Sequence, residues 1–293
     1  MKQVRPKKNL GQHFLTDLTI ARRIADTVDA CPELPVLEVG PGMGVLTQYL
    51  AEKPRPLRVV EIDAESVAYL KKTIYARWYE GTEVRGDENS CDAESDLAPS
   101  HLRTPAPPII EGDFLRMDLR QLFDGQQFVL TGNYPYDISS QIFFKMLDNR
   151  DLIPCCTGMI QREVALRMAA QPGSKTYGIL SVLIQAWYDV EYLFTVEPSV
   201  FNPPPKVQSA VIRMTRNDVR QLGCDEDLFK RIVKTVFNQR RKMLRVSLRQ
   251  FLQQDSINRL ATQTDLTRRP EQLSIAQFVS LTNLVSELPA DLK

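Results

Sequence analysis

The sequence lacks any apolar run that approaches the roughly 20 residues a membrane-spanning helix needs. It also lacks the pattern of a secretory signal, because the basic residues 1–8 are not followed by an apolar stretch and a small-residue cleavage site. With 43% hydrophobic and 25% charged residues, the chain has enough apolar surface to form a folded core. We therefore expect a soluble protein of the cytoplasm that does not associate with membranes.

Cysteine is scarce and shows no motif. The five cysteines are odd in number and no pair has CxxC spacing, so the sequence favours neither a disulfide framework nor a zinc site. We predict reduced, structural thiols and no bound metal. The cysteines are Cys31, Cys91, Cys155, Cys156 and Cys224.

An excess of one charge is absent as well, since 37 Lys and Arg residues against 36 Asp and Glu residues give a formal net charge of +1. The charges are unevenly distributed, however. Basic residues gather at the N-terminus and between positions 230 and 249, whereas residues 80–108 are acidic and end in prolines. We interpret the acidic stretch as an inserted surface loop that points away from nucleic acid, because its charge would repel phosphates.

Short apolar strands alternate with helical patterns over the first 150 residues. Strands are predicted at residues 35–40, 57–62, 109–110 and 128–130. Helices are predicted at residues 19–30, 45–52, 67–78 and 138–147. This alternation is typical of an α/β fold in which helices cover both faces of a parallel sheet.

The pattern changes towards the C-terminus. Helices at 162–170 and 177–187 are followed by strands at 190–196 and 207–214, and beyond about residue 217 only helical patterns remain. We therefore predict a main domain over residues 1–216, which includes the acidic insertion at about 80–108, and a small all-helical domain over residues 217–293.

The ends of the first three predicted strands carry residues suited to a nucleoside cofactor. The first strand runs into Gly40, Gly42 and Gly44, which let the backbone turn tightly and approach a ligand, although an ordinary tight turn would have the same composition. The second strand ends near Glu61, which can accept hydrogen bonds from both ribose hydroxyls, and the third near Asp113, which can accept one from an adenine amino group. Together, on one sheet edge, they predict a nucleoside-binding site.

The fourth strand runs into the sequence Asn133-Tyr134-Pro135-Tyr136. The exocyclic amine of a base is a poor nucleophile because its lone pair is delocalised into the ring. The side-chain carbonyl of Asn133 and the backbone carbonyl of Pro135 can accept its two hydrogens and so aim the lone pair at a methyl donor. Tyr136 can stack on the extruded base. A simple proline turn is the alternative interpretation.

Seven motifs resemble, in order, those of the ribosomal RNA adenine N6,N6-dimethyltransferase family, specifically its bacterial branch acting on 16S rRNA. They are residues 9–15, the turn at 38–44, Glu61, Gly112-Asp113, residues 133–136, residues 201–207 and residues 237–242. The resemblance covers nearly the whole chain. It implies a Rossmann-like class I methyltransferase sheet, with a small all-helical C-terminal domain, that uses S-adenosylmethionine as its cofactor.

The same resemblance implies the substrate and the partner. The expected reaction is dimethylation of two adjacent adenines in a hairpin near the 3′ end of 16S rRNA, within an immature 30S subunit. A role in subunit biogenesis follows from that substrate. Nothing in the sequence indicates an obligate oligomer, so we expect a monomer.

The resemblance also implies roles for individual residues. The cofactor contacts are His13, Leu15, Gly40, Glu61, Asp113 and Asn133. The catalytic residues are Asn133, Pro135, Tyr136 and Phe201, the last as a second stacking surface for the target base. The phosphate-binding residues are Lys7, Lys8, Lys206, Arg240, Arg241 and Lys242, of which the last three would otherwise belong to a solvated helix face.

Tyr134 departs from the family, which usually has an aliphatic residue there, and its larger side chain can reshape the pocket. The acidic insertion is also unusually long. Two other functions are open at this point. One is amino-methylation of DNA adenine or of a protein glutamine, which the Lys206 loop and the helical C-terminal domain disfavour. The other is a non-catalytic ribosome-assembly factor, which the presence of Asn133 and Glu61 disfavours.

Overall fold

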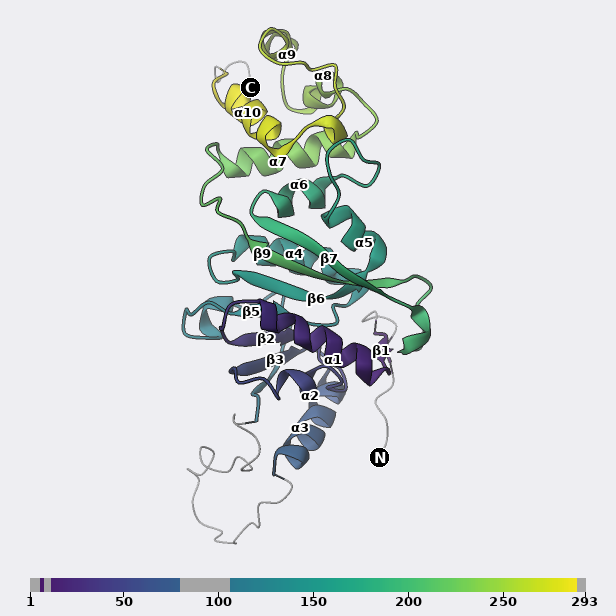
Figure 1. Ribbon diagram of the computed structural model, residues 1–293. Helices are drawn as coiled ribbons and strands as arrows, with labels where there is room; N and C mark the ends of the chain where they lie inside the picture. Colours follow the sequence, from purple (N-terminus) through teal and green to yellow (C-terminus); the bar gives the residue numbers. More distant parts are fainter. Residues whose placement is uncertain (1–5, 8–11, 80–105, 289–293) are drawn as a thin grey trace. The chain divides into compact units, whose positions relative to one another are not determined.

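The computed structural model describes residues 6–7, 12–79 and 106–288 (Figure 1). Most of the predicted insertion, together with Lys8 and Cys91, lies outside these residues. The chain forms two compact units, one of residues 1–162 and 192–215 and the other of residues 163–191 and 216–293. Because the second unit also includes residues 163–191, the assignment of residues 217–293 as a domain of their own stays a prediction.

A seven-stranded sheet is built in the order β4-β3-β2-β5-β6-β9-β7. Its strands are β2 (Val36–Val39), β3 (Leu57–Glu61), β4 (Ile109–Glu111), β5 (Val129–Thr131), β6 (Cys155–Gln161), β7 (Tyr188–Val196) and β9 (Ser209–Arg216). Strands β4, β3, β2, β5 and β6 pair in parallel, whereas β9 is antiparallel to β6. The parallel arrangement is therefore confirmed for the four predicted strands, which correspond to β2, β3, β4 and β5. Strand β6 was not predicted, and β9 makes the whole sheet mixed.

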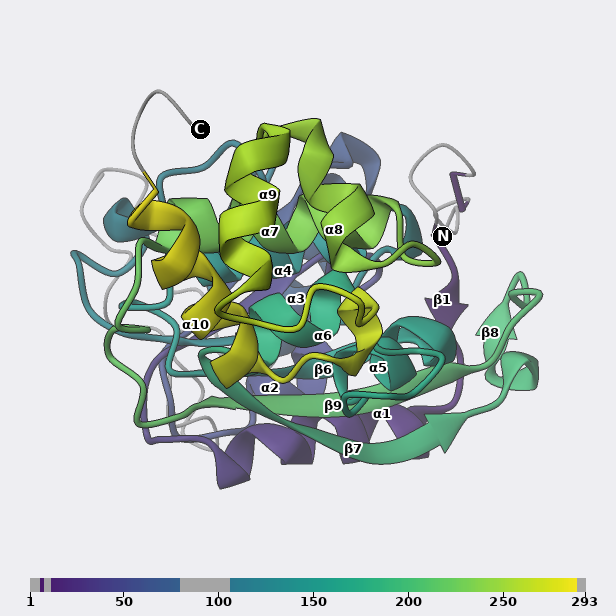
Figure 2. The same cartoon turned by 90° about the horizontal axis from the view of Figure 1, so that it is seen from above.

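Helices cover both faces of the sheet, as predicted. The longer helices before residue 150 are α1 (Leu18–Asp26), α3 (Ala64–Tyr79) and α4 (Ser139–Asp148). Helix α1 begins at Asp17, whose carboxylate accepts hydrogen bonds from the backbone of Thr19 and Ile20 and so satisfies two otherwise unpaired amides. Helices α1 and α4 lie on opposite faces of the sheet (Figures 1 and 2). The main hydrophobic core of this unit lies beneath α1, where Ile24 is fully buried.

The second unit is helical beyond residue 216, as predicted. Its helices there are α7 (Glu226–Asn238), α8 (Leu244–Ser247), α9 (Gln254–Ala261) and α10 (Ile275–Ser286). Aromatic rings pack its core: Trp187 lies edge-on to Phe229, and Phe237 contacts both Tyr177 and Phe278. Within residues 12–79 and 106–288, no helix combines the length and the apolar character that spanning a lipid bilayer requires.

Two further features that join distant segments were not predicted from the sequence. A two-stranded antiparallel sheet joins β1 (Phe14–Leu15) to β8 (Phe201–Asn202), with Leu15 opposite Phe201. The prediction of reduced cysteines is wrong for Cys31 and Cys155, which form a disulfide with their Cα atoms 5.9 Å apart. These two residues are separated by 124 positions, and only the packing of the chain segment before β2 against β6 brings them together.

Candidate active site

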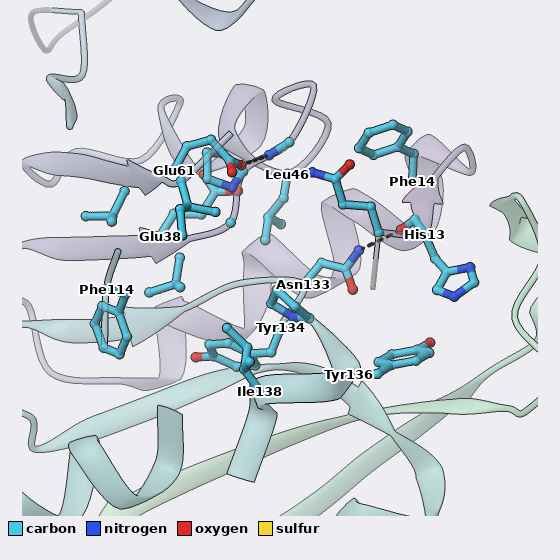
Figure 3. Close-up of a pocket in the computed structure, with 18 of the residues that line it drawn as sticks. His13, Phe14, Glu38, Leu46, Glu61, Phe114, Asn133, Tyr134, Tyr136 and Ile138 are labelled. Carbon is cyan, nitrogen blue, oxygen red and sulfur yellow. Dashed lines mark hydrogen bonds between the residues drawn. The ribbon is translucent and has the colours of Figure 1, made fainter. Parts of the chain in front are cut away.

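A cavity of about 230 Å³ lies at the carboxyl ends of β2, β3, β4 and β5 (Figure 3). This is the edge of an open α/β sheet at which ligands bind. Eight of the predicted cofactor and catalytic residues line it. They are His13, Leu15, Gly40, Glu61, Asp113, Asn133, Pro135 and Tyr136.

The turn after β2 needs its glycines. Gly40, Gly42 and Gly44 have φ angles of +70°, +56° and +79°, in the left-handed region that residues with a Cβ adopt at a cost. A Cβ on Gly42 would also lie 3.0 Å from the ring of Phe14, which covers the turn from β1. The backbone therefore follows a tight path around one side of the cavity, where a side chain would occupy the space.

Glu61 is held rigidly at the end of β3. Its two carboxylate oxygens accept hydrogen bonds from the backbone amides of Gly42, at 3.0 Å, and Asp63, at 2.9 Å. The side chain is buried, and this burial raises its pKa, while the backbone hydrogen bonds act in the opposite direction. Glu61 thus joins the end of β3 to the glycine turn, and each oxygen keeps a lone pair for a ligand hydroxyl.

Asp113 follows β4, is half-buried and lines the cavity. One of its oxygens accepts a hydrogen bond from the amide of Leu115 at 2.9 Å, and the other lies 3.3 Å from Nε of Arg116. Ile62, which follows β3 in the cavity wall, has a side chain that is 53% exposed. The two together present a carboxylate and an apolar surface, which suits the edge and the face of an adenine ring.

Glu38 is a cavity residue to which the sequence assigned no role. It lies within β2, is only 1% exposed, and its Oε2 atom has no hydrogen-bond partner among the described residues. Burial, and to a smaller extent the negative charge of Glu61, raise the pKa of Glu38 to about 8. A single acid inside an otherwise apolar strand is the signal that would have identified it, because such a group is costly to bury without a purpose.

We expect the replacement of Glu38 by glutamine to change how stability depends on pH. The pKa of Glu38 in the folded chain, about 8, lies above its ordinary value of 4.5, so folding favours the protonated form. Its stabilising contribution is complete below pH 4.5 and is lost as the pH rises towards 8. Glutamine mimics the protonated form at every pH, and the melting temperature of Glu38→Gln should therefore exceed that of the wild type increasingly between pH 5 and pH 8.5.

Thermal unfolding of the ligand-free protein measures this difference. The control is Glu111→Gln, which removes an exposed carboxylate from the same sheet edge. A difference between Glu38→Gln and the wild type that stayed constant over this pH range would contradict the assignment.

Asn133 is fixed through both its main chain and its side chain. The residues on either side of it, Gly132 and Tyr134, exchange backbone hydrogen bonds of 3.0 Å with Met159 of β6. Its side-chain Nδ2 donates a hydrogen bond of 3.2 Å to the carbonyl of His13, shown as a dashed line in Figure 3. Because the carbonyl can only accept, this bond determines the orientation of the amide, and Oδ1 is left as an acceptor in the cavity.

Tyr134 is 1% exposed and extends beneath the turn. Its hydroxyl donates to the carbonyl of Thr157, at 3.0 Å, and lies 3.2 Å from Sγ of Cys156. Burial raises the pKa of this hydroxyl well above 10, so it stays protonated. The side chain that departs from the family pattern is thus accommodated by hydrogen bonds to β6 and by the absence of a side chain at Gly158.

Tyr136 and Phe201 are not equivalent in the structure. Tyr136 lines the cavity, its ring stacks on that of His13 with centroids 5.5 Å apart, and its hydroxyl is hydrogen-bonded to the hydroxyl of Ser209. Phe201 is 4% exposed, packs into the main core and does not line the cavity. The structure therefore brings Tyr136, but not Phe201, together with the other residues predicted to be catalytic.

The residues predicted to bind phosphates are divided between the two units. Lys7 forms ion pairs with Asp63 and with Glu65, the latter at 3.5 Å. Lys206 is exposed in the unit that contains the cavity, whereas residues 240–242 belong to the other unit. There, Arg240 donates to the carbonyl of Ser174 at 3.1 Å, and Arg241 and Lys242 are exposed. Lys8 lies outside the described residues.

Comparison with known proteins agrees with this geometry. The family model for ribosomal RNA adenine dimethylase matches residues 3–85 and 94–287. The "Ribosomal RNA small subunit methyltransferase A" of Bacteroides thetaiotaomicron is 63% identical over 287 residues, which cover 98% of this chain and 96% of the relative.

Two solved structures share the fold. A dimethyladenosine transferase from Plasmodium falciparum is 24% identical and has a TM-score of 0.68, covering 92% of this chain and 96% of its own. The 23S rRNA methyltransferase ErmE is 23% identical and has a TM-score of 0.63, covering 94% of this chain and 100% of its own. At such identities the likeness concerns the fold alone. The family is shown by the match to the ribosomal RNA adenine dimethylase model and by the 63% identity to the Bacteroides thetaiotaomicron protein. The chain belongs to the ribosomal RNA adenine dimethylase family.

Proposed function

We propose that this protein transfers methyl groups from S-adenosylmethionine to the N6 amines of two adjacent adenines in a hairpin near the 3′ end of 16S rRNA. The product is N6,N6-dimethyladenosine, and the reaction is part of 30S subunit biogenesis. Family membership supports adenine in ribosomal RNA as the substrate. The observation that carries the chemistry is the orientation of the Asn133 amide, which directs an acceptor oxygen into a cavity that Tyr136 also lines.

The cavity residues fit S-adenosylmethionine. The left-handed glycine turn brings its backbone to the cavity wall, and the fixed carboxylate of Glu61 can accept the ribose hydroxyls. Asp113 and Ile62 suit the edge and the face of the adenine, and the unpaired oxygen of Glu38 can accept a hydrogen bond from the amino group of the methionine moiety. When bound, this cofactor supplies an electrophilic methyl group on a sulfonium.

The residues of the 133–136 turn prepare the acceptor amine. Oδ1 of Asn133 accepts one hydrogen of the N6 amine, and the carbonyl of Pro135 accepts the other. The carbonyl of Pro135 already accepts a long hydrogen bond of 3.3 Å from the amide of Ile138. Its second lone pair can accept the hydrogen bond from the substrate amine. Two acceptors favour a pyramidal nitrogen whose lone pair points out of the base plane. Tyr136 holds the base by stacking. The nitrogen becomes cationic and acidic once the sulfonium has given up its methyl group, so its proton passes to water and no side chain is needed as a general base.

The decisive experiment supplies the protein with S-adenosylmethionine labelled on the methyl group and with 30S subunits from cells that lack the modification. Digestion to nucleosides should release the label as N6,N6-dimethyladenosine. Transfer to DNA adenine or to a protein glutamine alone, when DNA and protein are supplied in parallel reactions, would support an amino-methyltransferase of another class. Binding to subunits without any transfer would indicate a non-catalytic assembly factor. Neither alternative is favoured by the family match.

We further propose that the exposed residues Arg241 and Lys242 contact rRNA phosphates, with the subunit bound by a monomer of this chain. Removing a side chain that neutralises one phosphate should lower the slope of log K against log salt by about 0.9. The double variant Arg241→Ala/Lys242→Ala should therefore bind 30S subunits more weakly and with a slope smaller by about 1.8. Filter binding between about 50 and 200 mM salt measures this.

The matched control is Lys71→Ala/Lys72→Ala, which removes the same charge from an exposed part of α3. It should leave the slope close to that of the wild type. An equal decrease in both double variants would mean that only the overall charge matters and would contradict phosphate binding at residues 241–242.

A further inference from the structure

The two halves of His13 face different parts of the site. Its main-chain carbonyl accepts the hydrogen bond from Nδ2 of Asn133 at 3.2 Å. Its ring points the other way: in Figure 3 it lies towards Tyr136 and away from Glu38 and Glu61. The contacts of the ring are therefore separate from the cofactor side of the cavity.

The ring of His13 makes two contacts. It stacks on Tyr136 with ring centroids 5.5 Å apart and an interplanar angle of 30°, and its Nδ1 lies 2.8 Å from the carbonyl oxygen of Pro203. A carbonyl oxygen only accepts hydrogen bonds, so Nδ1 carries the hydrogen and donates it. One ring thus links the predicted base-stacking tyrosine to the proline-rich segment that follows β8.

Strand β8 and the residue before it, Val200, are already joined to the chain around His13. Phe14 pairs with Asn202 across the small sheet, and Val200 accepts hydrogen bonds from the amide of Thr16 at 2.8 Å and from its hydroxyl at 2.9 Å. The bond from His13 to Pro203 extends this line of contacts by one step towards Tyr136. The hydroxyl of Tyr136 is held on its other side by Ser209.

We propose that the His13 ring is a positioning residue for the target adenine. It fixes the Tyr136 ring and the Pro203 carbonyl, whereas only its main-chain carbonyl acts on Asn133. This inference rests on the proposed function, since it assigns the ring to the part of the site that receives the base. It predicts that removal of the ring weakens retention of the singly methylated adenine, which must stay or return to receive its second methyl group.

Three substitutions separate the two contacts of the ring, and all three keep the main-chain carbonyl. His13→Asn keeps an N–H that can reach Pro203 but removes the stacking ring. His13→Phe keeps a ring on Tyr136 but removes the donor, and His13→Ala removes both. Thr16→Val is the matched control, because it deletes another hydrogen bond between the same two segments without contacting Tyr136.

For His13→Ala we expect kcat/KM for unmethylated 30S subunits to fall roughly 10- to 50-fold, the combined effect of one stacking contact and one hydrogen bond. The share of N6-monomethyladenosine in the product should rise. His13→Asn and His13→Phe should each show part of this effect. The dissociation constant of S-adenosylmethionine, measured by calorimetry, should stay within about twofold of the wild type for all three variants. Each of them keeps the main-chain carbonyl of residue 13 and its hydrogen bond from Asn133, which is the contact on the cofactor side. Thr16→Val should leave the product ratio unchanged.

A double-mutant cycle with Tyr136→Leu completes the test. In the Tyr136→Leu background, His13→Ala should reduce kcat/KM little further, because the ring acts through Tyr136. Fully additive reductions in an active enzyme, or a reduction of cofactor affinity as large as that of kcat/KM, would overturn the inference and leave the proposed function intact. A wild-type protein that transferred no methyl group to 30S subunits would overturn both.

Discussion

Replacing Asn133 by alanine should lower the rate of methyl transfer about 10²–10³-fold, the usual cost of removing one preorganised polar group from a transition state. The cavity offers the N6 amine two acceptors, Oδ1 of Asn133 and the carbonyl of Pro135. Alanine removes the first, so the amine stays planar and conjugated with the ring. Because Asn133 is half-buried at the surface of the cavity, its truncation leaves the core intact and the melting temperature nearly unchanged.

Single-turnover transfer to 30S subunits, with S-adenosylmethionine affinity measured separately, gives this rate. Asn133→Asp is the matched variant, since its side chain has the same length and still carries an acceptor oxygen. It removes the Nδ2 donor, however, and places a carboxylate against the His13 carbonyl, which Asn133 contacts at 3.2 Å. We expect a slower rate there too, caused by misorientation. A rate for Asn133→Ala within about threefold of the wild type would refute the role assigned to Oδ1.

The strand ends could be predicted from the sequence because each depends on a local pattern. Short, mainly apolar segments define β2, β3, β4 and β5, and the residues that follow them are necessarily at the same edge of a parallel sheet. That rule alone placed Gly40, Glu61, Asp113 and Asn133 around one cavity, and all four line it.

Features that depend on distant segments were not predicted. Six of the seven residues of β6 are buried. A strand that is buried on both faces shows no alternation of apolar and polar residues, and β6 also contains Gly158 and two cysteines, so its sequence does not predict a strand. The same strand supplies Cys155 to the disulfide with Cys31. The pairing of β1 with β8 likewise joins residues almost 190 positions apart. It holds Phe201 in the core, while Pro203, two residues further on, contacts the ring of His13.

Charged side chains were the least predictable. Lys7 belongs to a basic stretch that resembles a phosphate-binding arm, yet it forms ion pairs with Asp63 and Glu65 beside the end of β3. A charge run in the sequence gives no information on which acidic residues will lie near it after folding. Its phosphate-binding role stays a prediction, and the ion pairs give Lys7 an alternative use in binding to the carboxylates that follow β3.

Among the described glycines, Gly158 is the one at which an added methyl group, as in Gly158→Ala, should be most destabilising. Gly158 lies in the middle of β6 with φ at +144°, a conformation that L-residues rarely adopt. A Cβ there would lie 2.4 Å from the carbonyl oxygen of Gly132 and 2.7 Å from the ring of Tyr134. Backbone strain and overpacking each cost about 1–3 kcal/mol, so we expect a total of roughly 2–6 kcal/mol and a melting temperature lowered by about 5–15 °C.

Activity should fall even at temperatures where Gly158→Ala is still folded. The methyl group presses on both residues that flank Asn133, and the hydrogen bonds of Gly132 and Tyr134 with Met159 are what fix its main chain. Gly125→Ala is the control, because φ there is also positive, at +78°, but nothing lies within 4 Å of the added Cβ. It should cost only the backbone strain and leave the rate of transfer unchanged.

Calorimetric unfolding and single-turnover rates of Gly158→Ala, Gly125→Ala and the double variant Gly158→Ala/Tyr134→Leu distinguish the contributions. The smaller leucine relieves the contact with the ring but not the contact with the Gly132 carbonyl, so we expect partial recovery of stability. Equal destabilisation in Gly158→Ala and Gly125→Ala would mean that only backbone conformation matters. The close packing of Tyr134 over β6 would then contribute nothing to the position of Asn133.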